Sequence, residues 1–68
     1  IELVGVSEHD VADAIRNAVR RAAETLRGLD WFEVQQVRGT IRDGAVHQFQ
    51  VVLKVGFRVM SPEELEGE

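Results

Sequence analysis

Apolar residues in this chain change their period once, from the spacing of an α-helix to that of β-strands. Between residues 11 and 29 they recur every three or four positions, at Val11, Ile15, Ala18, Val19, Ala22, Leu26 and Leu29. From Trp31 to Val59 they alternate with polar residues. The alternation breaks at Arg42-Asp43-Gly44, which is typical of a hairpin turn. The pattern predicts one amphipathic helix followed by two long strands.

The segments on either side of this pattern complete the predicted order. Residues 1–6 favour a short strand, so the elements run strand, helix, strand, strand. Ser7 is expected to cap the helix, with Asp10 as the carboxylate of a capping box, and Gly28 to end it. Residues 1–60 are expected to form a single domain. The acidic tail over 61–68 contains the only proline and is expected to fray or to form one helical turn.

The two long strands do not share one parity. In the last strand the residues expected to face the helix are Phe49, Val51, Leu53, Val55, Phe57 and Val59. In the preceding strand Phe32 and Val34 fit a core position, but so do Val37 and Ile41, which lie on the opposite parity. One extra residue near Gln35-Gln36, a β-bulge, reconciles the two halves.

The turn at Arg42-Asp43-Gly44 sets the expected register between the two long strands. A three-residue loop with Gly44 in the left-handed conformation would place Val37 opposite Phe49 and Ile41 opposite Ala45. The same pairing places Trp31 near Lys54. The face away from the helix is then expected to carry Trp31, Arg38, Gln48, Gln50, Val52, Lys54, Gly56 and Arg58.

This outer face has two interpretations, which do not exclude each other. Trp and Arg are enriched in subunit interfaces, so the face could join copies of the chain. It could equally bind a flat, anionic, heteroaromatic ligand. An indole stacks on rings, a glutamine amide offers both a donor and an acceptor, and arginines hold phosphate.

Length and charge narrow the range of partners. A chain of 68 residues buries only about 60% of its unfolded surface, which favours stabilisation by self-association. A net charge of -4 argues against nucleic acid as the main partner. No apolar run approaches the ~20 residues of a membrane span. Without cysteine or a signal-peptide pattern, a cytoplasmic location and no metal site are expected.

Several blocks of sequence together resemble the dodecins, a family of small flavoproteins, over nearly the whole chain. The matching blocks are Val4-Gly5-Val6-Ser7, Leu29-Asp30-Trp31-Phe32-Glu33-Val34, Arg38-Gly39, Asp43-Gly44, Phe49-Gln50-Val51 and Lys54-Val55-Gly56-Phe57-Arg58. The resemblance implies an α+β fold of order β-α-β-β, with a three-stranded antiparallel sheet wrapped around one helix. It also implies a hollow homododecamer that binds FMN or riboflavin and stores or buffers it.

The resemblance also implies roles for four residues. Trp31 matches the tryptophan that stacks on the flavin ring, and Gln50 the glutamine that hydrogen-bonds the edge of that ring. Arg38 and Arg58 match basic residues that contact the phosphate of FMN. Because Trp31 and Gln50 lie several strand positions apart, each ligand is expected to touch more than one subunit. Some members also carry coenzyme A, but through N-terminal residues absent from this sequence, so coenzyme A is kept only as a candidate ligand.

Two other functions stay open. One is a purely structural oligomer in which any ligand is incidental. The other is a flavin-dependent oxidoreductase, which would need a substrate path to the reactive part of the ring. Neither His9 nor His47 lies in a pattern that suggests acid-base chemistry, and an indole flat on the ring would block the face where hydride moves. The sequence therefore favours a binding protein over an enzyme.

Overall fold

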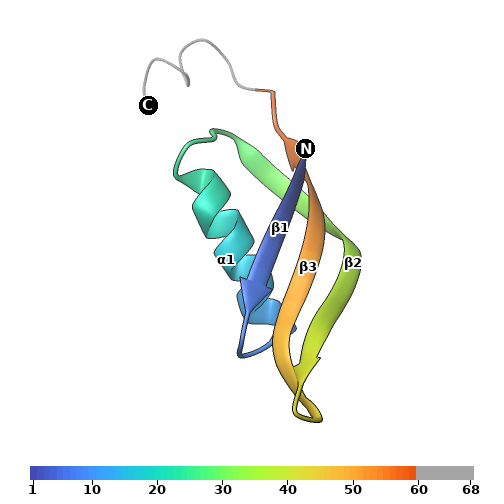
Figure 1. The fold of residues 1–68 in the computed structure, drawn as a ribbon. Coiled ribbons are helices and arrows are strands. Elements are labelled where there is room, and N and C mark those ends of the chain that lie inside the picture. The colour runs from blue at the N-terminus through green and yellow to red at the C-terminus, as the bar shows by residue number, and fades with distance from the viewer. Residues whose placement is uncertain (60–68) are drawn as a thin grey trace.

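Three antiparallel strands and one helix make up the fold in a computed structural model, which describes residues 1–59 (Figure 1). The elements are β1 (Glu2–Ser7), α1 (Val11–Ala23), β2 (Leu29–Arg42) and β3 (Ala45–Phe57). The α+β class and the order β-α-β-β are therefore confirmed. The acidic tail expected over 61–68 lies outside the described residues.

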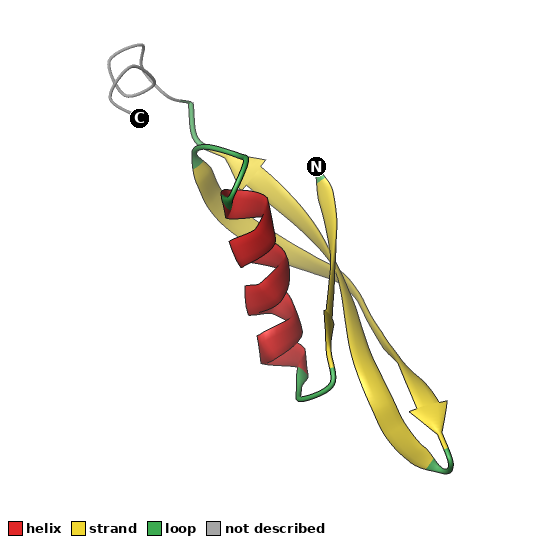
Figure 2. Cartoon of the chain, turned by 60° about the vertical axis from the view of Figure 1, so that its left-hand side comes forward, coloured by secondary structure: helices red, strands yellow, loops and turns green. Residues whose placement is uncertain are grey.

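The sheet has the order β1-β3-β2, so the last strand of the chain lies in its centre. Both neighbours run antiparallel to β3. The helix packs on one face of the sheet, over β1 and β3. Figure 2 shows the turn of the β2–β3 hairpin extending beyond the N-terminal end of α1, so much of the hairpin has no helix over it.

The core lies where α1 meets β3 and β1. Its buried members are Ala14, Ala18, Val51 and Leu53. Ala14 is fully buried, although the predicted apolar stripe did not include it. A methyl group on Gly5 would collide with the Ala14 carbonyl and the Ala18 side chain. The alanines and this glycine thus allow the helix and β1 to approach closely.

The beginning of the helix differs from the prediction. Asp10, rather than Ser7, is the N-cap, and its carboxylate accepts a hydrogen bond from the Asp13 backbone N–H at 2.6 Å. Ser7 still belongs to β1; its hydroxyl donates to the Asp13 carboxylate at 2.6 Å. The helix also ends earlier, with Glu24 as C-cap, so Gly28 belongs to the connection to β2 with a φ of 74°.

The hairpin turn has two residues, and the predicted three-residue loop is wrong. Arg42 pairs with Ala45, and the residues between them, Asp43 and Gly44, have φ of 52° and 78°. Positive φ at both central residues characterises a type I′ turn, whose twist suits a β-hairpin. Glycine adopts this conformation without strain, and aspartate tolerates it better than most residues.

Three bulges set the register of β2 on β3. The predicted one is confirmed, since Gln35 is the extra residue between Val34 and Gln36. The other two, at Asp30 in β2 and at His47 in β3, were not predicted.

The unpredicted bulge at His47 and the shorter turn together shift the expected pairs. Val37 pairs with Val51 rather than Phe49, and Ile41 with Val46 rather than Ala45. Lys54 pairs with Glu33, and Trp31 pairs with Gly56, two positions further along β3.

Several residues expected in the core are exposed in the single chain. The helix-facing side of β2 carries Phe32, Val34, Val37 and Ile41, with exposed fractions from 39% to 78%. The bulge does bring them to one face, but the helix covers β1 and β3 instead. Phe57 and Val59, expected to face the helix, are exposed as well. Their prediction as core was wrong for the isolated chain.

Candidate functional site

Trp31 lies on the outer face of the sheet, directly across from Gly56. Trp31 continues the register of the Phe32–Val55 pair and so lies opposite Gly56, and the Asp30 bulge beyond it lets Leu29 pair with Phe57. A methyl group on Gly56 would overlap Nε1, Cε2 and Cζ2 of the indole. The ring therefore rests against the backbone of β3, and 48% of the residue stays exposed. This arrangement covers one part of the indole and leaves a flat apolar surface open.

A second group of polar residues lies further along the same face. Arg38 pairs with Gln50 across the two strands, and its Nε–H donates to Gln50 Oε1 at 2.9 Å. Gln50 Nε2 in turn donates to Gln48 Oε1 at 3.0 Å. We call these three residues, Arg38, Gln50 and Gln48, the amide relay. The predicted outer-face positions of all three are confirmed by the register.

The relay leaves hydrogen-bonding capacity for a ligand. A primary amide has two N–H donors and an oxygen with two lone pairs, of which the relay uses one each. Gln50 can therefore offer a donor and an acceptor side by side. A guanidinium has five N–H groups, and the bond to Gln50 uses one of them. The rest of Arg38 can pair with an anionic group.

The indole and the relay are far apart in one chain. Gly56 and Gln50 are six residues apart on β3, which at ~3.3 Å per residue corresponds to roughly 20 Å. A ring that lies flat on Trp31 therefore cannot reach Gln50 of the same chain. The separation agrees with the expectation that one ligand touches two subunits, which stays a prediction.

Arg58 lies at the end of the sheet that carries Trp31. It follows directly after β3, two residues beyond Gly56, and its backbone N–H donates to the Gly28 carbonyl at 3.0 Å. This bond fixes the end of β3 next to the start of β2. The structure thus groups Trp31 with Arg58 at one end, and Arg38 with Gln50 further along the face.

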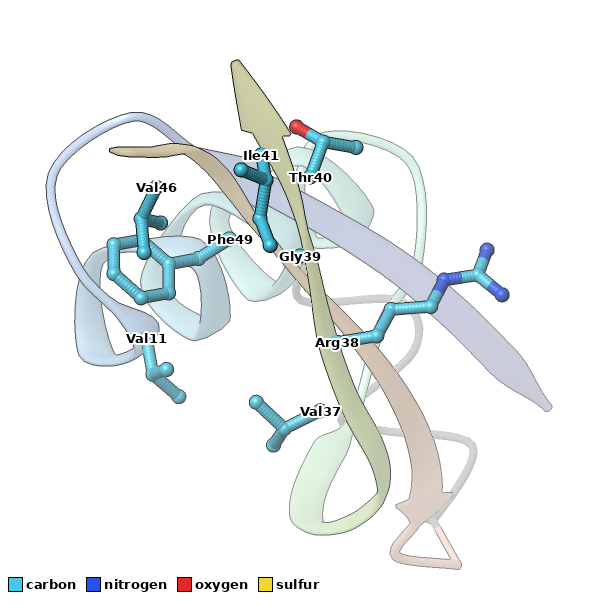
Figure 3. Close-up of a pocket in the computed structure, with 8 residues that line it drawn as sticks. All are labelled: Val11, Val37, Arg38, Gly39, Thr40, Ile41, Val46 and Phe49. Atoms are coloured by element: carbon cyan, nitrogen blue, oxygen red, sulfur yellow. The ribbon is translucent and has the colours of Figure 1, made fainter. Parts of the chain in front are cut away.

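The helix-facing side of the hairpin has an apolar concavity of about 320 Å³, which sequence reasoning missed (Figure 3). Its walls include Val11 from the start of the helix, Val37 and Ile41 from β2, and Phe49 from β3. In Figure 3 the Arg38 side chain points away from these residues. The only signal for the concavity was the row of apolar residues on β2, which the sequence alone could not show to be uncovered.

Another polar group lies where β1 meets the helix. Ser7 donates to Asp13, and this hydrogen bond is the main reason that the pKa of Asp13 lies below its ordinary value. Electrostatic interactions with His9 and Arg16 lower the pKa of Asp13 further, whereas desolvation opposes them. Ser7 bonds a carboxylate rather than an imidazole, so the group stabilises the start of the helix and does not resemble an activated nucleophile.

Residues 1–59 lack the features of a metal centre and of a membrane-spanning helix. They contain no cluster of three or more His, Cys, Asp or Glu side chains that could hold a metal ion. No helix in this range is long and apolar enough to cross a membrane.

Comparison with known proteins gives concordant matches over most of the chain. Residues 1–60 match the family model described as Dodecin. The Dodecin of Thermus thermophilus is 56% identical over 59 residues, which is 87% of this chain and 86% of the relative. The solved dodecin of Streptomyces coelicolor is 59% identical, with a TM-score of 0.84 over 90% of this chain and 87% of that one. The dodecin of Streptomyces davaonensis is 49% identical, with a TM-score of 0.84 over 90% of both chains.

Proposed function

The chain belongs to the dodecin family, and from this and the outer-face geometry we propose that it binds flavin without catalysing a reaction on it. The ligand is FMN or riboflavin, held between subunits of a hollow homo-oligomer, most simply a dodecamer as the resemblance implies. The protein then serves as a cytoplasmic store and buffer of flavin. Coenzyme A is retained as a second ligand to be tested.

One observation carries the proposal: the indole of Trp31 lies across Gly56, with its side chain half exposed. An exposed apolar ring costs solvation free energy unless something covers it. A flavin ring stacked on it would remove that surface and add roughly 0.5–1.5 kcal/mol from ring–ring interaction. Stacking also brings an electron-rich indole against the flavin, so electron transfer should quench its fluorescence.

The polar residues supply the remaining contacts. Gln50 of a neighbouring subunit bonds the edge of the flavin ring, because its amide has a donor and an acceptor to spare. Arg38 and Arg58 bind the phosphate when FMN is the ligand. Solved structures of the Thermus thermophilus dodecin include variants at one tryptophan and at two arginines, spaced by seven and then twenty residues. Trp31, Arg38 and Arg58 have the same spacing.

An oxidoreductase fits this geometry less well. Stacking on Trp31 covers one face of the flavin, and a second stacked flavin across a symmetry axis would cover the other. Hydride transfer needs one of those faces open to a substrate. The role that the arrangement favours is therefore sequestration of the ring.

Replacing Trp31 by alanine tests the proposal. Flavin affinity should fall at least about tenfold, since the stacking surface is lost. The particle mass, measured by light scattering, should stay that of the unchanged protein. An unchanged flavin affinity in Trp31→Ala would contradict the proposal.

A second candidate function is a purely structural assembly, which the exposed apolar side of β2 favours. Phe32, Val37 and Ile41 leave a row of apolar surface that another copy of the chain could cover. The same Trp31→Ala variant separates the two functions. If the particle dissociates in the absence of flavin, Trp31 acts chiefly as an interface residue.

A further inference from the structure

Both polar atoms of the Gln50 side chain already have a partner within the chain. Oε1 accepts from Arg38 Nε at 2.9 Å, and Nε2 donates to Gln48 Oε1 at 3.0 Å. The two partners lie on different strands, Arg38 on β2 and Gln48 on β3. The amide is therefore held from both sides.

This arrangement fixes the direction of the amide. An amide group has nearly the same shape after rotation by 180°, so shape alone does not choose its orientation. Arginine has no acceptor and can only donate, so the oxygen must face Arg38. Arg38 thus determines which end of the amide is the oxygen, and the bond to Gln48 Oε1 holds the nitrogen end in place.

Two features of the sheet place Gln48 beside Gln50 on the outer face. Residues two apart on a strand project from the same face, so Gln48 and Gln50 are neighbours on the outer face. Gln48 pairs with Thr40. The bulge lies next to this pair, towards the hairpin turn, and His47 is its extra residue. Because of that bulge, Val46 turns into the apolar concavity while Gln48 stays on the outer face.

We propose that Gln48 is a positioning residue of the flavin site, which acts through Gln50 and not by contact with the ligand. This inference rests on the proposed function. With its orientation fixed, Gln50 presents one N–H and one lone pair in a set order along the strand. Such an edge recognises a carbonyl next to an N–H, the imide that a flavin carries in its pyrimidine ring. Gln48 thus contributes to selection of the imide edge.

The test compares riboflavin with its N3-methyl derivative, in which the imide N–H is absent. Riboflavin has no phosphate, so contacts of arginine with phosphate do not enter. Quenching titrations should give the unchanged protein at least about a tenfold preference for riboflavin, because the methylated ligand leaves Gln50 Oε1 without a donor. In Gln48→Leu the preference should fall to about threefold or less, because the single bond to Arg38 then leaves the nitrogen end of the amide free to swing away from the ligand.

Two variants serve as controls. Gln48→Glu keeps an acceptor for Gln50 Nε2, so this variant should keep the preference of the unchanged protein for riboflavin over the N3-methyl derivative. Gln35→Leu makes the same chemical change at an exposed glutamine whose amide bonds Glu33 rather than the relay, and it should leave the preference intact. In a Gln50→Ala background, a further Gln48→Leu change should have no effect.

The possible outcomes distinguish failure of the role given to Gln48 from failure of the proposed flavin binding. If the unchanged protein binds neither flavin, the proposed function fails, and the role of Gln48 fails with it. If it binds riboflavin but Gln48→Leu keeps the full preference, only the role of Gln48 is overturned. An effect of Gln48→Leu that persists without Gln50 would also overturn it, because Gln48 would then act on the ligand or on the fold.

Discussion

At the scale of single residues, the orientation of Trp31 depends on the absence of a side chain at Gly56. The indole occupies the space that a β-carbon would need. Glycine weakens a strand, because it has no side chain to pack and loses more backbone entropy on folding. Here the indole fills the gap left by the glycine and gains a fixed support.

Gly56→Ala should therefore displace the indole and lower riboflavin affinity about tenfold or more. The near-ultraviolet circular dichroism of the unliganded protein should change as well, because the surroundings of its only tryptophan change. Titration of riboflavin by fluorescence gives the affinity.

A Trp31→Phe background provides the control for this prediction. A phenyl ring is smaller, so adding the methyl group at position 56 should then cost much less affinity. If Gly56→Ala costs the same in both backgrounds, the glycine acts on the strand and not through the indole.

Arg58→Ala should weaken FMN more than riboflavin, because only FMN has a phosphate. A charge-assisted hydrogen bond contributes about 1.5–3 kcal/mol, so the additional loss for FMN should be roughly tenfold or greater. Arg38→Ala should show the same preference together with some loss for riboflavin, since Arg38 also holds Gln50. Calorimetric titrations with both ligands give the comparison, and equal losses for the two ligands would refute the phosphate contacts.

At the scale of elements, the start of the helix depends on Asp10 and Asp13. The Asp10 carboxylate caps the helix, and the Asp13 carboxylate accepts a bond from Ser7 of β1. These contacts join the end of the first strand to the first turn of the helix. Loss of the Asp10 cap, in Asp10→Ala, should cost about 1 kcal/mol of folding stability.

Asp13 makes this junction sensitive to acid. Its pKa in the folded chain lies below the ordinary value of 3.8, chiefly because of the Ser7 hydroxyl. A carboxyl group whose pKa falls on folding stabilises the fold above its unfolded pKa, and this contribution is lost as the pH falls towards the folded pKa.

The stability difference between the unchanged protein and Asp13→Asn should therefore shrink as the pH is lowered through the range below about 4. Thermal unfolding followed by circular dichroism, from neutral pH downwards, measures this difference. Ser7→Ala should reduce the acid dependence in the same way. A stability difference that stays constant with pH would contradict the role given to Asp13.

The elements were predictable because their hydrophobic periods are clear, whereas their junctions were not. Period alone does not say that β1 extends through Ser7, which moves the N-cap to Asp10. The bulge at Gln35 was predictable, since apolar residues on both sides of it change parity. No comparable change of parity in the sequence marks the bulge at His47, because that bulge depends on the two-residue turn at Asp43-Gly44.

At the scale of the whole molecule, the chain leaves apolar surface on the helix-facing side of its hairpin. The concavity beside Val37, Ile41 and Phe49 is open in the single chain. A domain of this size has little interior of its own, so a second copy that covers this surface would add stability. The outer face would then stay available for the proposed flavin.

Ile41→Asp should therefore dissociate the particle or lower its midpoint of thermal unfolding, because a charge would be buried at the subunit contact. Analytical ultracentrifugation measures the mass. Val59→Asp is the matched control, since Val59 is 98% exposed beyond the end of β3. A particle that Ile41→Asp leaves intact and equally resistant to heat would show that this side of the hairpin is not an interface.

The candidate site was predictable only in part, because some of its features depend on strand register and on contacts between subunits. Alternation placed Arg38 and Gln50 on one face, which the register confirms, whereas their direct pairing was not predicted because the expected register was two positions away. The support of Trp31 by Gly56 could not be predicted, because it depends on the two-residue turn and the bulge at His47, which together move the register by two positions. The proposed joining of two half-sites would depend on contacts between subunits, which one sequence does not encode as a pattern.

Stacking of flavin on Trp31 is tested most directly by the flavin absorbance and emission of the purified protein, before and after denaturation. We expect flavin absorption bands with quenched emission, and recovery of the emission when the protein unfolds. Any protein obtained without flavin should quench added FMN to a fixed stoichiometry. A colourless protein that leaves the emission of added FMN unchanged would contradict a flavin site, and Trp31 would then be only an interface residue.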